Sequence, residues 1–554
     1  MIKKTIINYL QEKIKKVLKH DYNLEIKNFI VEKNKDIING DIYTNIAMAS
    51  AKKIGRIPLE FATELSNKLL KECDPVFEKI EAIKPGYINF YISNEYKKEY
   101  LKYVNNMKND YGQFVNKNFL YNIEFVSANP TGYLHIGHAR NAALGMTLAN
   151  IWKKYGINVE KEYYINDAGN QINILGISTY LRYLELNGIS VNMDGDYYKA
   201  SEIIKIAKEI KNIYGNKYVG FEYNETSIFD KEVFEFFKQY ALEKMLVFIK
   251  EDLNNLGIKF DMFSSEKSLY SDNSIPDAIE NLKEYIYKKD DATWLKTTSF
   301  GDDKDRVLIK SNGDYTYFMP DIAYHFKKIT RNPSVKKIFN IWGADHKSYV
   351  DRMTIALQCL GFPKDIMHVI IMQMVRLTKN GEEFKMSKRS GNSLTLKDLL
   401  EAIGKDGARW ALVSQAAASQ IEIDVDKFKL QTHDNNLFYV LYAYARMSQI
   451  IAKSETSKTD EVNLLTTNKE KDLINSIIYY PCTIENISKN YEVNKLVNFL
   501  YAVAQTFHSY YNETKILEDE NKELISQRIY LLKCVKYMIY SGLALLNITP
   551  KEKI

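Results

Sequence analysis

A strand, a turn-rich loop, a helix and a second strand form the most constraining pattern in this chain. Residues Tyr121–Val126 are apolar and extended in pattern, and the loop Ser127–Leu134 contains a proline and a glycine. A helix is predicted at His135–Tyr155, ended by a glycine, and Asn158–Ile165 forms the next strand. This order predicts a parallel sheet covered by helices.

The rest of the chain divides by its periodicity, and the fold class is α/β and multidomain. Residues 1–108 combine helical spacing of apolar residues with a strand-like alternation at Tyr87–Ile92, which predicts an α+β N-terminal domain. Residues 109–425 form the parallel-sheet domain with a mostly helical insertion at about 168–300, and residues 426–554 form an all-α domain. Further strands are predicted at Arg306–Ile309, Thr316–Phe318, Lys337–Ile341 and His368–Met372.

The composition is that of a globular chain without a membrane segment. Hydrophobic residues make up 45% and charged residues 26% of the 554 residues. No stretch approaches the roughly 20 consecutive apolar residues that a membrane-spanning helix needs. The formal net charge of +6 permits a polyanionic partner without demanding one, because only clustered charge makes a nucleic-acid surface.

The four cysteines are far apart in the sequence and form no metal-binding pattern. No C-x-x-C pair occurs, and no histidine stands near a cysteine at ligand spacing. We interpret them as reduced, buried thiols, which predicts a cytoplasmic protein without zinc; they are Cys73, Cys359, Cys482 and Cys534.

The tetrapeptide His135-Ile136-Gly137-His138 lies where the first predicted strand gives way to its helix. Ligands of open parallel sheets bind at the carboxyl ends of strands, and a helix N-terminus favours phosphate. The i, i+3 spacing puts both imidazoles on one face of the first turn, and Gly137 would let a nucleotide come close. Alone the signal is weak, because two histidines near a helix start are more often structural.

A second signature, KMSKRSG at 385–391, is a polar loop between apolar segments. Taken alone it is a solvated basic turn. Its two lysines can instead fold over a triphosphate and balance the charge that grows during phosphoryl transfer, where one well-placed donor contributes about 3 kcal/mol. The two signatures in this order indicate an enzyme that acts on ATP.

Longer segments around both signatures resemble one family, the arginyl-tRNA synthetases. The matching segments are EFVSANPTGYLHIGHARNAAL at 124–144, YTYFMPDIAYH at 315–325, WGADHKSYV at 342–350 and FKMSKRSGNSLTL at 384–396. The similarity covers nearly the whole chain and thins at about 170–235 and 452–490. It implies a class I Rossmann-type catalytic domain, an N-terminal additional tRNA-binding domain and a C-terminal DALR-type anticodon-binding domain.

The resemblance implies that Glu124, Tyr317 and Asp321 hold the guanidinium of arginine. A guanidinium is planar, permanently charged and forked, so carboxylates and a phenol at its edges match it better than they match an ammonium. Simpler interpretations exist for two of these residues. Glu124 could lie on a solvated strand face, and Asp321, after a proline, could favour a helix dipole.

Further residues take their roles from the resemblance. Asn129 and His135 match positions that hold the α-amino and α-carboxylate groups of the substrate. The implied ATP contacts are His135, Gly137, His138, Gly343, Asp345, His346, Met386, Ser387 and Lys388. The implied catalytic residues are His135, His138, Lys385 and Lys388, and no residue is assigned to a metal. Asp345 could instead cap the helix that follows it.

The implied enzyme is an arginine–tRNA ligase. It activates arginine with ATP and Mg²⁺ to arginyl-adenylate and transfers the arginyl group to the 3′ terminal adenosine of tRNA(Arg), releasing AMP and pyrophosphate. No general base is required, because the arginine carboxylate is already ionised at pH 7. The resemblance also implies a cytoplasmic monomer with tRNA(Arg), arginine and ATP as partners and no membrane partner, whose activation step needs bound tRNA.

Three other functions stay open at this point. The first is a class I synthetase for another amino acid, and lysine is the nearest rival to arginine because two carboxylates would tolerate an ammonium. A cysteine enzyme would show a zinc cluster, and a glutamate enzyme would need cationic groups at the site. A small-molecule adenylyltransferase shares the first signature but has no use for a helical C-terminal domain. A synthetase-like RNA-binding protein without catalysis is disfavoured by the intact signatures.

We expect Lys388→Ala to slow adenylate formation on the order of 100-fold with little change in arginine affinity, because this lysine matters chiefly in the transition state. ATP–pyrophosphate exchange at varied arginine concentration measures both quantities. A variant that loses arginine affinity but keeps its turnover would contradict this role.

Overall fold

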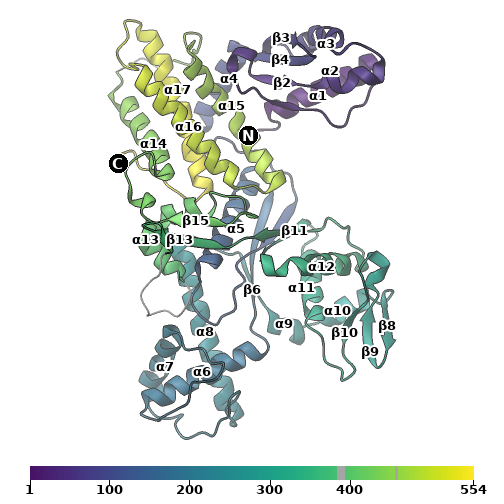
Figure 1. The fold of residues 1–554 in the computed structure, drawn as a ribbon, viewed down its shortest axis with the longest axis vertical. Helices are drawn as coiled ribbons and strands as arrows, with labels where there is room; N and C mark the ends of the chain where they lie inside the picture. Colours follow the sequence, from purple (N-terminus) through teal and green to yellow (C-terminus); the bar gives the residue numbers. More distant parts are fainter. Residues whose placement is uncertain (384–393, 456–458, 554) are drawn as a thin grey trace. The chain divides into compact units, whose positions relative to one another are not determined.

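The computed structural model describes residues 1–383, 394–455 and 459–553. The chain divides into two compact units, labelled by element in Figure 1. The first contains residues 1–116, 154–156 and 430–554, and the second contains residues 117–153 and 157–429. Among the described residues, no helix combines the length and apolar character that crossing a bilayer requires.

The N-terminal part of the first unit is an antiparallel sheet packed with helices. Its strands, in the spatial order β1-β2-β4-β3, are β1 (Val31–Lys33), β2 (Ile42–Thr44), β3 (Phe77–Ile83) and β4 (Tyr87–Ile92). Its helices are α1 (Ile6–Tyr22), α2 (Ile46–Ala51), α3 (Pro58–Glu72) and α4 (Asn94–Met107), with 3-10 turns at Ile37–Asn39, Lys52–Ile54 and Lys108–Asp110. The predicted strand at Tyr87–Ile92 is confirmed as β4.

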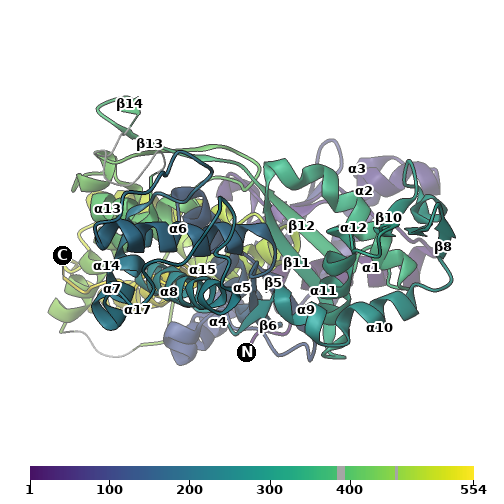
Figure 2. The same cartoon turned by 90° about the horizontal axis from the view of Figure 1, so that it is seen from below.

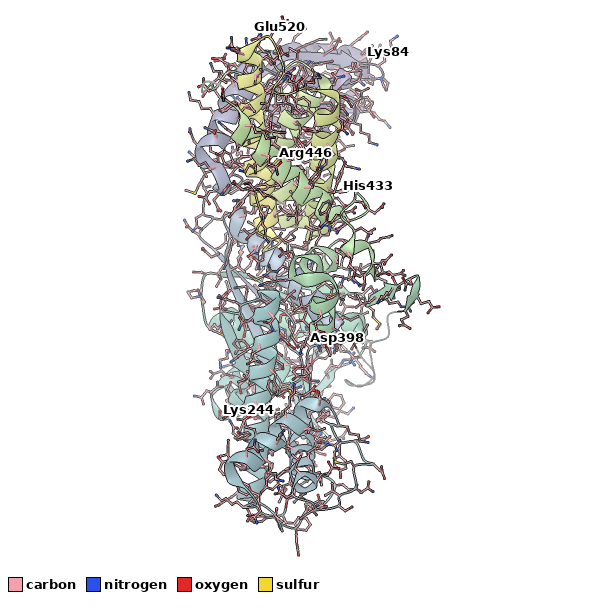
Figure 3. The ribbon with its side chains drawn as sticks, turned by 90° about the vertical axis from the view of Figure 1, so that its left-hand side faces the viewer. Lys84, Lys244, Asp398, His433, Arg446 and Glu520 are labelled. Atoms are coloured by element: carbon pink, nitrogen blue, oxygen red, sulfur yellow. The ribbon has the colours of Figure 1, made fainter. Side chains whose placement is uncertain are left out.

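The C-terminal part of the first unit is a helical bundle, as its periodicity predicted. It consists of α14 (Asn436–Lys453), α15 (Asn468–Asn490), α16 (Asn494–Glu513) and α17 (Lys522–Leu545). Within the unit, buried Asp41 accepts hydrogen bonds from Asn475 at 2.6 Å and, through its carbonyl, from Tyr479 at 2.8 Å. Arg446, labelled in Figure 3, lies on α14. Its guanidinium is 4.5 Å from the centre of the Tyr442 ring.

The core of the second unit is a five-stranded parallel sheet in the order β12-β11-β5-β6-β7. The strands are β5 (Leu120–Glu124), β6 (Asn158–Ile165), β7 (Met262–Ser265), β11 (Val335–Gly343) and β12 (Met367–Met372). Helix α5 (Ile136–Lys154) connects β5 to β6, which confirms the predicted strand, helix, strand unit. The chain order reverses beside β5, and ligands of open parallel sheets bind at such a point.

Helix α5 packs closely against the sheet because of one glycine. A Cβ atom at Gly145 would lie 2.3 Å from the ring of Phe125, so only glycine allows this approach. Trp152 at the far end of α5 contacts Phe339 of β11, with ring centroids 4.4 Å apart. Buried Arg140 donates to the carbonyl of Gln373 at 2.7 Å and thereby ties α5 to the segment after β12.

The remaining elements of the second unit surround the sheet. The helices are α6 (Asn170–Leu186), α7 (Ser201–Tyr214), α8 (Lys231–Leu256), α9 (Glu266–Ser271), α10 (Ser274–Asn281), α11 (Phe318–Thr330), α12 (Lys347–Cys359) and α13 (Leu396–Leu412). Two small sheets contain β8 (Ile286–Lys289), β9 (Ala292–Leu295) and β10 (Arg306–Ile309), and β13 (Val375–Lys379), β14 (Glu382–Glu383) and β15 (Ile421–Asp424). Short 3-10 turns occur at Thr297–Phe300, Ala344–His346 and Lys427–Lys429. Figure 2 shows the β13–β14 hairpin extending away from its neighbours.

One detail of the predicted secondary structure is wrong. The insertion is mostly helical as expected, in α6 to α10, with the short strands β7, β8 and β9 among the helices. In the described structure, the predicted strand at Thr316–Phe318 is replaced by a single antiparallel bridge between Tyr315 and Ile309 of β10, and α11 begins at Phe318. Pro320 in the first turn favours this helix start over an extended segment.

A buried ion pair joins α11 to the sheet. Glu162 of β6 is fully buried and accepts hydrogen bonds from Arg331 at 2.5 Å and from Asn122 at 2.7 Å. Burial alone would raise the pKa of Glu162, but the hydrogen bond and positive charge of Arg331 outweigh it and lower the pKa to about 2. Arg331 also pairs with Glu160, whose side chain is 22% exposed.

We expect Glu162→Gln to lower the free energy of unfolding of the second unit by about 3 kcal/mol, because it breaks a buried ion pair. Glu160→Gln removes a more exposed partner of the same arginine and should cost less than about 1 kcal/mol. All four tryptophans, Trp152, Trp294, Trp342 and Trp410, lie in the second unit, so their fluorescence in urea reports its unfolding.

The effect of Glu162 should also depend on pH. Because its pKa is lower in the folded chain than the ordinary value of 4.5, its stabilising contribution is complete above about pH 4.5 and is lost as the pH falls toward 2. Equal losses of stability in the two variants would contradict the burial argument.

Candidate active site

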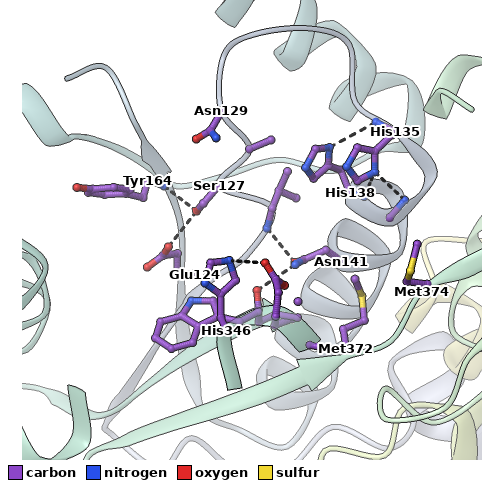
Figure 4. A pocket seen from close by; sticks show the side chains of 18 of the residues that line it. Glu124, Ser127, Asn129, His135, His138, Asn141, Tyr164, His346, Met372 and Met374 are labelled. Carbon is purple, nitrogen blue, oxygen red and sulfur yellow. Dashed lines mark hydrogen bonds and ion pairs between the residues drawn. The ribbon is translucent and has the colours of Figure 1, made fainter. Parts of the chain in front are cut away.

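A cavity of about 1430 Å³ lies at the carboxyl ends of the parallel strands of the second unit (Figure 4). Single small-molecule pockets usually occupy about 300–1,000 Å³, so this cavity has room for two ligands. It brings together nine of the residues predicted from the sequence: Glu124, Asn129, His135, Gly137, His138, Asp321, Gly343, Asp345 and His346.

Among the described residues, Tyr317 is the predicted site residue that does not line the cavity. It stands at the start of α11 with 88% of its surface exposed, and its assignment stays a prediction. Lys385, Met386, Ser387 and Lys388 lie outside the described residues. The nearest described residues on either side of that segment, Glu383 and Leu394, both line the cavity.

Two stacked imidazoles mark the start of α5. The rings of His135 and His138 are 3.6 Å apart between centroids and nearly parallel, at 21°. The Nδ1 atom of His135 accepts from the backbone N–H groups of Gly137 at 3.1 Å and His138 at 3.3 Å. His135 therefore caps the helix with an unprotonated nitrogen.

Partial desolvation keeps both imidazoles uncharged. It lowers the pKa of His135 below its ordinary value, and it lowers the pKa of His138 to about 3, with a further contribution from the neighbouring His135 ring. A Cβ atom at Gly137 would lie 2.9 Å from the His135 ring, so the glycine also permits the capping geometry. At neutral pH this end of the cavity offers polar ring nitrogens rather than fixed positive charges.

The loop after β5 has a strained backbone that one side chain stabilises. Val126 has φ 68° and Ser127 has φ 38°, a region that a β-branched residue rarely adopts. Asn141 of α5 accepts from the N–H of Val126 at 2.8 Å and donates to the carbonyl of Ile341 at 2.9 Å. The loop is thus fixed to α5 and to β11 at the same time.

The following part of the loop is held by helices α7 and α8. The buried carboxylate of Glu202 accepts from the N–H of Tyr133 at 2.9 Å, and Asp252 accepts from the N–H of Leu134 at 3.4 Å. Burial raises the pKa of Asp252 to about 6. The helical insertion therefore positions the segment that leads into the histidines.

Glu124 is buried and paired rather than solvated. It is 7% exposed, accepts from the hydroxyl of Ser127 at 3.0 Å and forms an ion pair with Lys328 at 2.8 Å. The interpretation of Glu124 as a residue on a solvated strand face is therefore wrong. Its carboxylate lies at the end of β5, across the cavity from the two histidines (Figure 4).

Asp321 and Glu266 add to an acidic end of the site. Asp321, in the first turn of α11, accepts from the hydroxyl of Tyr349 at 2.6 Å. Burial raises the pKa of Asp321 to about 6 despite this hydrogen bond, and the charge of Glu124 adds to the shift. Burial and the charges of Asp321 and Asp167 raise the pKa of Glu266 to about 7. A cationic ligand would relieve this repulsion.

The end of β11 and the turn after it contribute Gly343, Asp345 and His346. A Cβ atom at Gly343 would lie 2.5 Å from a carboxylate oxygen of Asp345, so a larger residue at position 343 would require the Asp345 side chain to turn away. Asp345 pairs with the Nε2 atom of His346 at 3.2 Å, and both side chains are exposed. The start of α12 has no side-chain cap, so the alternative role of Asp345 as a helix cap is not observed.

Several residues of the site were missed by the sequence interpretation. They are Asn141, Tyr164, Lys328 and Tyr349, together with Glu202 and Asp252 in the insertion. The only available signal was helical spacing, which places Lys328 two turns after Asp321 on the same side of α11. Across the described ranges, no three His, Cys, Asp or Glu residues gather as a metal site, and the four cysteines are free, with Cys482 half-buried and the others buried.

Comparison with known proteins gives matches over nearly the whole chain. Three family descriptions apply: "Arginyl tRNA synthetase N terminal domain" to residues 4–92, "tRNA synthetases class I (R), catalytic domain" to residues 103–415, and "DALR anticodon binding domain" to residues 440–554. The arginine–tRNA ligase of Malacoplasma penetrans is 53% identical over 100% of this chain and 99% of its own.

Two further relatives agree. The arginine–tRNA ligase of Ureaplasma parvum serovar 3 is 42% identical over 100% of both chains. The solved structure of Thermus thermophilus arginyl-tRNA synthetase has the same fold, with a TM-score of 0.78 and 19% identity over 99% of this chain and 100% of that one.

We expect the imidazole of His138 to stay uncharged from pH 8 down to about pH 4, because its pKa is lowered to about 3. The ¹³Cε1 chemical shift of ring-labelled histidine measures this, with the resonance assigned by its loss in His138→Asn. His135→Asn should move the His138 pKa back toward 6.5, since it removes one cause of the shift. A His138 that titrates near 6.5 in the unaltered chain would contradict the burial of the pair.

Proposed function

The chain belongs to the arginyl-tRNA synthetase family, and we propose that the cavity at the strand ends is the place where arginine and ATP react. The chain is a class I aminoacyl-tRNA ligase that activates arginine with ATP and transfers it to tRNA(Arg). One observation carries the assignment of the site: a single cavity has an acidic end at Glu124 and Asp321 and an imidazole end at the start of α5. These ends suit a guanidinium and a triphosphate.

At the acidic end, Glu124 and Asp321 bind the guanidinium. Each carboxylate already has one firm partner, Lys328 for Glu124 and Tyr349 for Asp321, so each presents its remaining lone pairs from a fixed position. Two carboxylates facing a forked cation give more hydrogen bonds than they give to an ammonium. Tyr317, exposed at the start of α11, is the third contact.

Between the two ends, Asn129 and His135 hold the α-amino and α-carboxylate groups of arginine. Both line the cavity, and His135 is fixed by its capping hydrogen bonds. The carboxylate is thereby aimed at the α-phosphorus without the help of a general base, because it is ionised at neutral pH.

At the imidazole end, ATP lies over the first turn of α5. The helix N-terminus favours the phosphates, and the ring N–H groups of His135 and His138 donate to them. Gly137, Gly343, Asp345 and His346 form the wall against which the nucleoside lies. Lys385, Met386, Ser387 and Lys388 complete the ATP contacts, and the two lysines balance the charge on the departing pyrophosphate.

The reaction then has two steps. An arginine carboxylate oxygen attacks the α-phosphorus, pyrophosphate leaves, and arginyl-adenylate forms. The 2′-hydroxyl of the terminal adenosine of tRNA(Arg) attacks the activated carbonyl, and AMP leaves. Since no three potential metal-binding side chains gather in the described part of the chain, we assign Mg²⁺ to the triphosphate itself, and no step here depends on it.

Localisation, oligomeric state and the role of tRNA in activation are also proposed here. We propose that the protein is a cytoplasmic monomer and that it activates arginine only when tRNA is bound. ATP–pyrophosphate exchange with all twenty amino acids, with and without tRNA, tests the substrate and the requirement together. Exchange stimulated by lysine in place of arginine, or by arginine without tRNA, would overturn the corresponding part.

We expect Asp321→Asn to raise the KM for arginine on the order of 100-fold at pH 8 and to leave the KM for ATP within about twofold, because the guanidinium loses a charged partner. In the unaltered enzyme the pKa of Asp321 is about 6, and only the ionised form binds a cation. The KM for arginine should therefore rise about tenfold per pH unit below pH 6, and Asp321→Asn should abolish this dependence.

The matched control is Asp277→Asn. Asp277 is the acidic residue in the first turn of α10, as Asp321 is in α11, but it is exposed and does not line the cavity. Similar effects of the two variants would show that a helix dipole, and not guanidinium binding, explains Asp321.

A further inference from the structure

A lysine without contact to solvent stands behind the acidic end of the site. Lys328 of α11 is 0% exposed and does not line the cavity. Its ammonium donates to Oε2 of Glu124 at 2.8 Å and to Oδ1 of Asn340 on β11 at 2.8 Å. The pair joins positions 204 residues apart in the sequence.

These contacts fix a continuous chain of hydrogen bonds that reaches Asp321. Because Oδ1 of Asn340 accepts from Lys328, its Nδ2 must donate to Nε2 of His325, which lies 2.7 Å away. Nδ1 of His325 then carries the ring proton and donates to the carbonyl of Asp321 at 2.8 Å. Burial lowers the pKa of His325 to about 4, so the ring is neutral as this arrangement requires. Lys328 is therefore connected to the carboxylate of Glu124 directly and, through Asn340 and His325, to the main-chain carbonyl of Asp321.

The charge of Lys328 also decides what the acidic end presents to a ligand. A carboxylate buried at 7% exposure without a partner would be costly to keep and free to turn. With Lys328 on Oε2 and the hydroxyl of Ser127 on Oε1, the carboxylate of Glu124 is paired and oriented. Pre-oriented charged acceptors lose less entropy when they bind a forked cation.

We propose that Lys328 is a positioning residue for arginine recognition, which holds the carboxylate of Glu124 in the orientation that receives the guanidinium. This inference rests on the proposed role of Glu124 in binding arginine. Lys328 does not line the cavity and affects arginine through its contact with Glu124. A merely structural pair, such as Glu162 of β6 with Arg331 at the end of α11, would instead affect stability without a selective effect on arginine.

A double-mutant cycle on Glu124 and Lys328 separates these roles. Glu124→Gln, Lys328→Met and the double variant are compared in aminoacylation assays of the full chain with tRNA(Arg), giving the KM for arginine, the KM for ATP and kcat. We expect Lys328→Met to raise the KM for arginine about tenfold or more while the KM for ATP stays within about twofold. In the double variant the KM for arginine should equal that of Glu124→Gln, because Lys328 has nothing left to position.

Two further variants control for stability and charge. Lys161→Met removes another buried lysine of the same sheet, which is 5% exposed, donates to the carbonyl of Lys259 at 2.6 Å and does not line the cavity. It should leave the KM for arginine unchanged. Lys328→Arg keeps the positive charge and should restore part of the arginine affinity lost in Lys328→Met.

The outcomes distinguish failure of this inference from failure of the proposed function. If Glu124→Gln leaves the KM for arginine unchanged, Glu124 does not bind the substrate. If Glu124→Gln raises this KM but Lys328→Met does not, or if the two effects multiply in the double variant, Lys328 does not act through Glu124. Should Lys328→Met fail to fold, the double variant leaves no charge unpaired, and a further loss of arginine affinity relative to Glu124→Gln overturns the inference.

Discussion

Helix α11 is held to the parallel sheet by charges that are buried from water, with Lys328 on Glu124 and Arg331 on Glu162. Removing each ion from water costs several kcal/mol, so such pairs persist only when both members have well-placed partners. Here the contact of Lys328 that attaches the helix also sets the position of the Glu124 carboxylate in the cavity. The geometry of the site therefore depends on the packing of α11 against the sheet.

The electrostatic state of the cavity before ligands bind follows from burial. His138 and His135 are neutral, Asp321 has a pKa near the physiological range, and the charge of Glu124 is matched by that of Lys328. The site thus avoids a large unbalanced charge while empty. A guanidinium and a triphosphate each bring the charge that the corresponding end lacks, and their binding in one cavity brings opposite charges close together.

The local sequence pattern predicted much of the secondary structure and its order. The site residues that it missed have partners far away in the sequence. The strand, loop and helix from β5 to α5 were predictable because periodicity and chain-breaking residues are local signals. The positions of His135, His138 and Gly343 in one cavity followed from the rule that strand ends of a parallel sheet gather at one edge.

The roles of Lys328 and Tyr349 were not predictable in this way. A lysine and a tyrosine on amphipathic helices read as surface residues until the fold brings them to partners far away in the sequence. The strand expected at Thr316–Phe318 was wrong for a different reason: the helix that begins at Phe318, favoured by Pro320 in its first turn, outweighs three residues of strand-like composition. The first turn of α11, and with it the exposed Tyr317, could only be placed once that start was known.

The spacing of Asp321, His325, Lys328 and Arg331 has an evolutionary consequence. Intervals of four, three and three residues keep these side chains on one side of α11, because each residue advances the helix by about 100°. Insertion or deletion of a single residue between positions 321 and 331 would rotate part of this row away from the sheet, and a compensating change elsewhere could not turn it back. During evolution, insertions and deletions should therefore be tolerated in the neighbouring loops and selected against within this helix. Substitutions on the outer face of the helix are not restricted in this way.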